Sequence, residues 1–181
     1  MIQEGESVWE KLQEIFDITV FYYNPNISED GEYRKRVEEQ KRLIEAINGK
    51  KPKCHIKIID GDYEPQEFYA VAKGLENCPE GGERCFRCYA LRLEKTAQAA
   101  KEGKYDYFTT TLTISPLKNA AKLNEIGEDM ALKYETAFLP SDFKKKEGYK
   151  RSIELSKEYD LYRQNFCGCA FSKAESLKRN V

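Results

Sequence analysis

The sequence predicts an α/β fold, a parallel sheet flanked by helices with a helical C-terminal part. Short segments rich in β-branched and aromatic residues alternate along the chain with longer segments of helical periodicity. Alternation of this kind builds a parallel sheet covered by helices. No repeat and no linker rich in Pro, Gly or Ser divides the 181 residues, so residues 1–181 are expected to form a single domain.

The strand-like segments are short, and turn residues follow them. Ile18–Tyr23 carries no charge and is β-branched and aromatic, as in a buried strand. Asn24-Pro25-Asn26 ends it, and Gly61 stops the second segment. The four expected strands are Ile18–Tyr23, Cys54–Asp60, Tyr105–Thr111 and Thr136–Leu139.

The helix-like segments carry an apolar stripe or helix-forming composition. In the first, Tyr33, Val37, Ile44 and Ile47 share one face, and Gly49 follows the expected end. The second begins with a proline, which suits a first helical turn. The six expected helices are Glu32–Asn48, Pro65–Asn77, Arg87–Lys101, Leu117–Tyr134, Gly148–Tyr159 and Ser172–Lys178.

The functional edge of such a sheet lies beyond the carboxyl ends of its strands. We therefore expect Tyr23–Asn26, Asp60–Asp62 and Thr110–Ser115 on that edge, and we predict Tyr23, Asn24, Asn26, Thr110 and Ser115 as substrate-binding residues. An open sheet of this type normally begins with a central strand, whereas Met1–Phe16 is polar and helix-like. We expect that first strand to be missing from the chain as given.

Composition narrows the class of protein. The hydrophobic fraction is 40% and the aromatic fraction 12%, which is enough for a folded core. The apolar runs are too short to span a bilayer, and Met1–Asp17 does not resemble a secretory signal. We therefore expect a cytoplasmic protein, in which the six cysteines serve metal or redox chemistry rather than disulfides.

The net charge of −1 conceals two basic blocks. Residues 82–123 carry 8 basic and 4 acidic side chains, and residues 141–181 carry 10 and 6. These blocks also contain the closely spaced cysteines. A local positive field favours an anionic partner such as a nucleic acid, although a solvated charged surface is an equally good reading of charge alone.

Two cysteine pairs are the strongest chemical signal. Cys85 and Cys88 form a CxxC just before an expected helix, whose N-terminus favours thiolates. Cys167 and Cys169 form a CxC around Gly168. Four thiolates at these spacings suit one tetrahedral zinc or an iron–sulfur cluster. The alternatives are a purely structural zinc and buried, inert cysteines.

The remaining cysteines carry a weaker signal. Cys54 begins an expected strand, where free cysteine is a common core residue, and a lone histidine such as His55 is more often structural than a ligand. Cys78 precedes a turn-like Pro and Gly segment, so we expect an ordinary loop there.

Basic and aromatic residues also surround the last cysteine pair. Asp142–Lys146 and Tyr162–Phe166 combine cations with aromatic rings, which suits phosphate contact and base stacking, although core aromatics beside a solvated run would look the same. We predict substrate contacts from Lys144, Lys145, Arg151, Arg163, Gln164 and Asn165.

Several long segments resemble the QueH-type epoxyqueuosine reductases. They are ERCFRCYALRLEKTAQAAKEGKYDYFTTTLTISPLKN and SDFKKKEGYKRSIELSKEYDLYRQNFCGCAFS, supported by FYYNPNI and YEPQEFYAVAKGLE, and the resemblance covers Ile18 to about Ser172. It implies a Rossmann-like fold of the adenine-nucleotide-hydrolase type, and reduction of the epoxide of epoxyqueuosine at the tRNA wobble position. It also implies that Cys85, Cys88, Cys167 and Cys169 bind a 4Fe-4S cluster, with a further mononuclear iron beside it. Members of that family usually begin with a strand leading into an adjacent cysteine pair, and we expect this chain to lack both.

The reaction that the resemblance implies needs two electrons, two protons and a way for the epoxide oxygen to leave. Asp142 is our candidate proton donor or metal ligand, and Thr109–Thr111 with Ser115 are candidate pocket residues. The sequence does not identify the electron donor. Two rival functions are an iron–sulfur tRNA thiolation enzyme and a zinc-stabilised RNA-binding module. The first would need a Gly-rich, Ser-containing pyrophosphate loop after its first strand. No SGGxDS-like run occurs in the sequence, and the segment that we expect to be missing is where one would lie.

Overall fold

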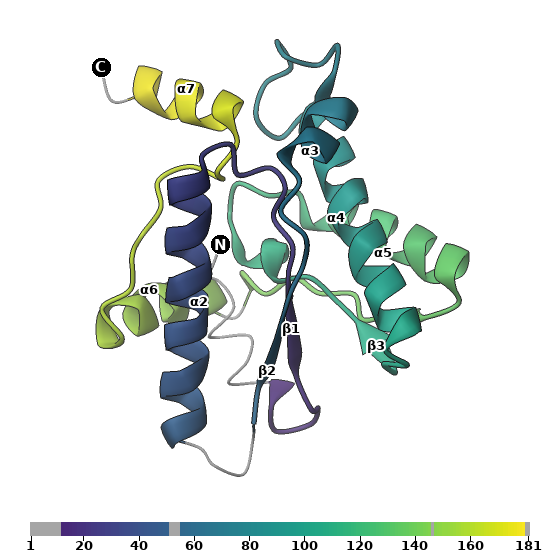
Figure 1. Ribbon diagram of the computed structural model, residues 1–181, viewed down its shortest axis with the longest axis vertical. Coiled ribbons are helices and arrows are strands. Elements are labelled where there is room, and N and C mark those ends of the chain that lie inside the picture. Colours follow the sequence, from purple (N-terminus) through teal and green to yellow (C-terminus); the bar gives the residue numbers. More distant parts are fainter. Residues whose placement is uncertain (1–11, 51–54, 146, 180–181) are drawn as a thin grey trace.

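A computed structural model describes residues 12–50, 55–145 and 147–179 of the chain (Figure 1). Helices and short strands alternate through most of it, as expected. The strands are β1 (Thr19–Tyr22), β2 (Lys57–Asp60), β3 (Tyr107–Phe108) and β4 (Ala137–Phe138). The helices are α2 (Asp30–Lys50), α3 (Pro65–Ala72), α4 (Glu83–Glu102), α5 (Ala120–Tyr134), α6 (Gly148–Glu158) and α7 (Ala170–Arg179), with a 3₁₀ turn η2 at Thr111–Ile114. None of the described helices is both long and apolar enough to cross a membrane.

The described strands form two small parallel sheets rather than the one sheet that we predicted. β1 pairs with β2 in a register that runs from Thr19 opposite Lys57 to Tyr22 opposite Asp60. β3 pairs with β4, with Tyr107 opposite Ala137. The α/β class is therefore correct, whereas a continuous Rossmann-like sheet is not formed by the described residues.

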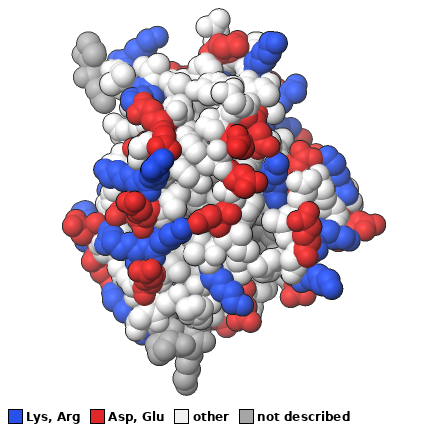
Figure 2. All heavy atoms as spheres, viewed as in Figure 1, with Lys and Arg blue, Asp and Glu red and all other residues white. Residues whose placement is uncertain are grey.

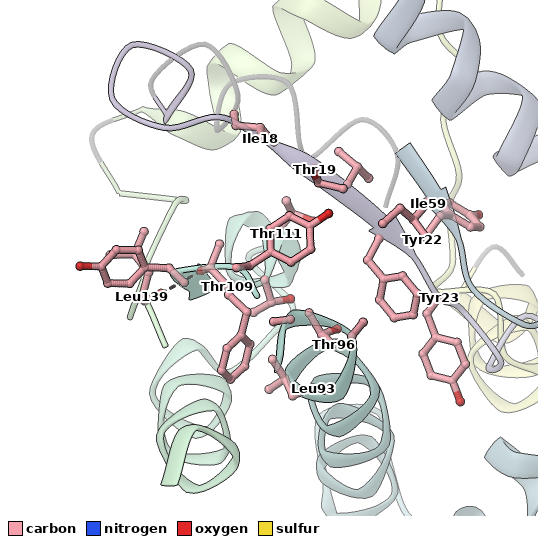
Figure 3. Close-up of a pocket in the computed structure, with 18 of the residues that line it drawn as sticks. Ile18, Thr19, Tyr22, Tyr23, Ile59, Leu93, Thr96, Thr109, Thr111 and Leu139 are labelled. Atoms are coloured by element: carbon pink, nitrogen blue, oxygen red, sulfur yellow. Dashed lines mark hydrogen bonds between the residues drawn. The ribbon is translucent and has the colours of Figure 1, made fainter. Parts of the chain in front are cut away.

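A cavity of about 500 Å³ lies between the two sheets (Figure 3). One wall is β1 with the residues on either side of it, including Ile18 and Tyr23, and the opposite wall is the chain around β3, including Thr109 and Thr111. Helix α4 closes the floor with Leu93 and Thr96.

The two larger of three apolar clusters among the described residues hold the main helices against the sheets. The first packs α2 through Leu43, Ile44 and Ile47 against Tyr22 and Ile56 near the β1–β2 sheet. The second packs α4 against α5 and β3, with Leu93, Ala97, Phe108, Leu123 and Ile126 at its centre. Each fully buried Leu or Phe stabilises such a cluster by about 1.5–3 kcal/mol. The clusters therefore anchor α2 and α4, which carry much of the site described below.

Several boundaries of helices and strands differ from the predicted ones, among them the start of α4, the end of α3 and the end of β3. α4 begins at Glu83 after Gly82, so Cys85 and Cys88 lie inside its first two turns rather than before it. α3 ends at Ala72, and Gly74 follows with a φ of +81°, a left-handed conformation that glycine adopts readily. The third strand stops at Phe108 because Thr110 accepts a hydrogen bond from the Leu112 amide and begins η2.

Candidate metal centre

The thiols of the four paired cysteines line one pocket, although about 80 residues separate the pairs. Cys85 and Cys88 come from the start of α4, and Cys167 and Cys169 come from the loop that leads into α7. Cys88 and Cys169 are buried, with exposed fractions of 8% and 5%. The Sγ atoms of Cys167 and Cys169 are 3.4 Å apart.

Residues from α2 and from the loop after β1 position the second pair. Arg36 and Asn26 both donate hydrogen bonds to the Cys167 carbonyl, at 3.2 and 3.1 Å. The Ser28 amide donates to the Gly168 carbonyl at 3.0 Å. Gly168 has a φ of +112°, and a Cβ there would lie 2.7 Å from Cγ1 of Ile27. Only glycine meets both requirements, so Gly168 lets the loop approach the β1 segment closely.

The first pair depends on the tight loop before α4. The Gly81 amide donates a hydrogen bond to Sγ of Cys85 at 3.3 Å. The Arg84 guanidinium, 2% exposed, donates to the carbonyls of Glu76 and Cys78 and forms an ion pair with Glu175 at 3.2 Å. Arg84 therefore fixes this loop to α7, which follows the second cysteine pair.

The thiol most readily ionised belongs to the second pair, contrary to our prediction for Cys85 and Cys88. The hydrogen bond with Cys169, together with the positive charge of Lys118, lowers the pKa of Cys167 to about 5. The same hydrogen bond and burial raise the pKa of Cys169. Burial raises the pKa of Cys85, and it raises that of Cys88 to about 12. Desolvation therefore outweighs the favourable field of the α4 N-terminus.

The chemistry of this pocket fits a thiolate-bound metal centre. Backbone amides donate to Cys85 and Cys169 sulfur atoms, as is common around iron–sulfur clusters. The Asn26 Oδ1 atom and the Tyr89 hydroxyl, which belong to residues lining the pocket, are buried and lack a hydrogen-bond partner among the described residues. Also among those residues, no three His, Cys, Asp or Glu side chains are arranged to hold a single ion. Binding would therefore require the four thiols to close around the metal.

The other residues predicted to bind substrate do not gather at this pocket. Asn24 accepts a hydrogen bond from Arg92 at 2.7 Å, and Arg92 lines the cysteine pocket. Tyr23 donates a hydrogen bond to Glu67 and borders the large cavity instead. Thr110 caps η2, and Ser115 is buried beyond its end. Of these residues, Asn26 alone lines the cysteine pocket.

The predicted basic residues near Asp142 already have acidic partners. Lys144 and Lys145 lie 3.8 and 3.2 Å from the Asp142 carboxylate, and Lys144 also donates to the Lys118 carbonyl. Arg151 lies 3.5 Å from Glu154. On the face shown in Figure 2, basic and acidic side chains are interspersed, so the charge blocks of the sequence do not form one continuous basic patch on this face.

The segment before Cys167 is largely accessible. Arg163 and Asn165 are exposed, Gln164 is half-buried, and Arg163 donates to the Ser156 hydroxyl at 3.2 Å. Among the weaker candidates, His55 is exposed, and Cys78 contributes its carbonyl to the Arg84 contacts. Cys54 lies outside the described residues.

Sequence reasoning missed four cations at this site. Arg36, Arg84 and Lys118 are buried and Arg92 is half-buried, and all four contact the cysteine loops or line their pocket. The only signal for Arg36 was a charge on the apolar side of α2, three residues after Tyr33. Lys118 lies between Leu117 and Asn119 and had no sequence signal of its own.

Comparison with known proteins places these features in a family. A family model described as "Epoxyqueuosine reductase QueH" matches residues 4–175. Proteins named epoxyqueuosine reductase QueH are 44% identical over 163 residues in Streptococcus pyogenes, 44% over 165 in Staphylococcus epidermidis and 35% over 168 in Thermotoga maritima. These alignments cover 90%, 90% and 91% of the chain, and 64%, 69% and 84% of the respective relatives.

Proposed function

We propose, from the premise that the chain belongs to the epoxyqueuosine reductase QueH family, that it reduces the epoxide of epoxyqueuosine in tRNA. The convergence of four cysteine thiols on one pocket is the observation that carries the proposal. The chain spans about two thirds of the length of the relatives from Streptococcus pyogenes and Staphylococcus epidermidis, 64% and 69%.

Cys85, Cys88, Cys167 and Cys169 would hold an iron–sulfur cluster, because thiolates are its usual ligands. We further propose a second iron beside it. Together these metals would supply electrons one at a time and a Lewis acid for the epoxide oxygen. The two electrons would arrive in two successive transfers from an electron donor that the sequence does not identify.

The chain's own residues would bind and orient the substrate at this pocket. Reduction breaks both C–O bonds of the epoxide, consumes two electrons and two protons, and releases the oxygen as water. Asn26 and Tyr89 offer an acceptor and a hydroxyl that are buried without partners among the described residues, which suits hydrogen bonds to a bound ligand. Asp142 stays our candidate proton donor or metal ligand. Its Oδ1 atom is buried and has no hydrogen-bond partner in the described part of the chain, although its carboxylate pairs with Lys144 and Lys145 and it is not among the residues that line the cysteine pocket.

The tRNA would approach over the loops that carry Lys144, Lys145, Arg151 and Arg163. Lys145 and Arg151 have side chains that are 76% and 40% exposed, so phosphates can reach them. Gln164 and Asn165 lie just before Cys167 and would contact the modified nucleoside. Phosphate contacts would position the tRNA, while the buried pocket would select the base.

The test is conversion of the modified nucleoside. Protein loaded anaerobically with iron and sulfide is incubated with epoxyqueuosine-containing tRNA and dithionite, and digested nucleosides are measured by mass spectrometry. Queuosine should form with wild type and with Cys78→Ala, and it should not form with Cys88→Ala. Conversion that survives Cys88→Ala would contradict the proposed centre. Zinc binding without conversion would instead favour an RNA-binding module.

A further inference from the structure

Lys118 is a buried cation whose backbone is held firmly beside the cysteine pocket. It follows η2, where its amide donates to the Ser115 carbonyl at 3.1 Å. Its own carbonyl accepts a hydrogen bond from Lys144 at 3.1 Å. Its side chain is 8% exposed and lines the pocket together with the four cysteines. Most of the solvent screening that weakens a surface charge is therefore absent here.

Within the described part of the chain, the Lys118 ammonium pairs with the carboxylate of Glu80. Nζ of Lys118 lies 3.2 Å from Oε1 of Glu80, which is itself only 12% exposed. Two further cations, Arg84 and Arg92, line the pocket, and each also binds groups outside it. Arg84 donates to backbone carbonyls and Glu175, and Arg92 donates to Asn24.

The charge of Lys118 acts on several thiols at once. Its side chain lines the same pocket as the four sulfur ligands, with little solvent to screen it. A positive charge that favours thiolates also favours any further negative charge placed among them. Adding an electron to a thiolate-bound centre is such a change, since the net charge around a cluster is one of the properties that set its potential.

We propose that Lys118 raises the reduction potential of the metal centre held by the four cysteines, with Glu80 moderating that effect. The inference rests on the proposed function, because it assumes a redox centre at this pocket. Lys118 would be a positioning charge rather than a catalytic residue, since it acts through the centre and not on the substrate.

The experiment is an anaerobic redox titration of the iron- and sulfide-loaded protein, followed by electron paramagnetic resonance. Lys118→Met should lower the ratio of reduced to oxidised centre at least tenfold at a fixed potential, which equals a 59 mV fall for one electron. Lys118→Arg should keep the wild-type ratio within a factor of three. Glu80→Gln should change the ratio in the opposite direction, because it removes a negative charge.

Lys122→Met is the matched control, since Lys122 lies four residues further along the chain and pairs with Glu125 outside the pocket. Its ratio should equal that of wild type. If Lys118→Met does not fold or load iron, the direction of the Glu80→Gln shift decides: a rise supports the proposal, and no rise overturns it. If the cluster loads but its reduction potential changes with neither substitution, the proposed role of Lys118 is overturned and the proposed cluster is not. A wild-type protein that takes up no iron and sulfide overturns the proposed cluster together with this inference.

Discussion

The guanidinium of Arg36 donates a hydrogen bond to the carbonyl oxygen of Cys167, 131 residues further along the chain. Arg36 is 2% exposed and also forms an ion pair with Glu32 at 2.6 Å. A second hydrogen bond, at 3.4 Å, reaches the Phe166 carbonyl. One buried side chain of α2 therefore connects the first apolar cluster to the loop that carries the second cysteine pair.

Replacing Arg36 with methionine should destabilise the fold by about 3 kcal/mol, because Glu32 and two carbonyls lose their buried partner. Arg34→Met is the control on the same helix. The Arg34–Asp30 pair has exposed fractions of 73% and 60%, so its loss should cost no more than about 0.5 kcal/mol. Urea unfolding measures both. Equal destabilisation by the two substitutions would show that the contact with Cys167 is unimportant.

A methyl group at Gly127 should destabilise the protein, whereas one at Gly49 should not. A Cβ at Gly127 would lie 2.3 Å from the Phe138 ring, and relieving that overlap should cost about 1–3 kcal/mol. A Cβ at Gly49 meets nothing within 4 Å, and alanine favours a helix over glycine by up to about 1 kcal/mol. Thermal unfolding of Gly127→Ala and Gly49→Ala should therefore shift in opposite directions. A Gly127→Ala protein as stable as wild type would contradict the described packing of α5 on β4.

The metal-free protein should show an unusually acidic thiol at Cys167. Its pKa of about 5 makes it mostly thiolate at pH 7, whereas Cys88, with a pKa of about 12, stays protonated. Alkylation by iodoacetamide, followed residue by residue with mass spectrometry, should therefore reach half its maximal rate near pH 5 at Cys167. A half-maximal rate near pH 9 at Cys167 would refute this assignment.

Binding of tRNA should depend steeply on salt, because each phosphate contact releases counterions. Charge reversal at Lys145 or Arg151 should weaken binding and reduce the slope of log K against log salt by about 1 for each lost contact. Lys101→Glu is the control, since Lys101 lies near the far end of α4, about 20 Å along the helix from Cys88. Fluorescence titrations at several salt concentrations would measure this. An unchanged slope in Lys145→Glu and Arg151→Glu would exclude these side chains from the interface.

The sequence was sufficient to predict most elements, because their signals are local. The uncharged run at Ile18–Tyr23 and the apolar stripe of Glu32–Asn48 correspond to β1 and α2 within two residues. The start of α4 was predicted four residues late, since charged and cysteine residues there gave no helical stripe. The division into two sheets was not predicted, because strand pairing depends on contacts between distant segments.

The residues of the candidate centre were likewise predictable where their signal is local, and were missed where their role depends on contacts between distant segments. Cysteine spacing pointed to Cys85, Cys88, Cys167 and Cys169, and the fold brings these four together. Arg36 and Lys118 were missed because a buried cation has no sequence pattern distinct from a solvated one. The acidity of Cys167 was missed because it arises from Cys169 and Lys118 in three dimensions.

Iron and acid-labile sulfide per chain, measured together on anaerobically prepared protein, test the central claim most directly. Our account predicts iron and sulfide in near-equal amounts, about four of each with any second iron in addition, in wild type and in Cys78→Ala. Both should fall together when Cys85, Cys88, Cys167 or Cys169 is replaced. One zinc per chain without sulfide, or full iron and sulfide after loss of either cysteine pair, would contradict it.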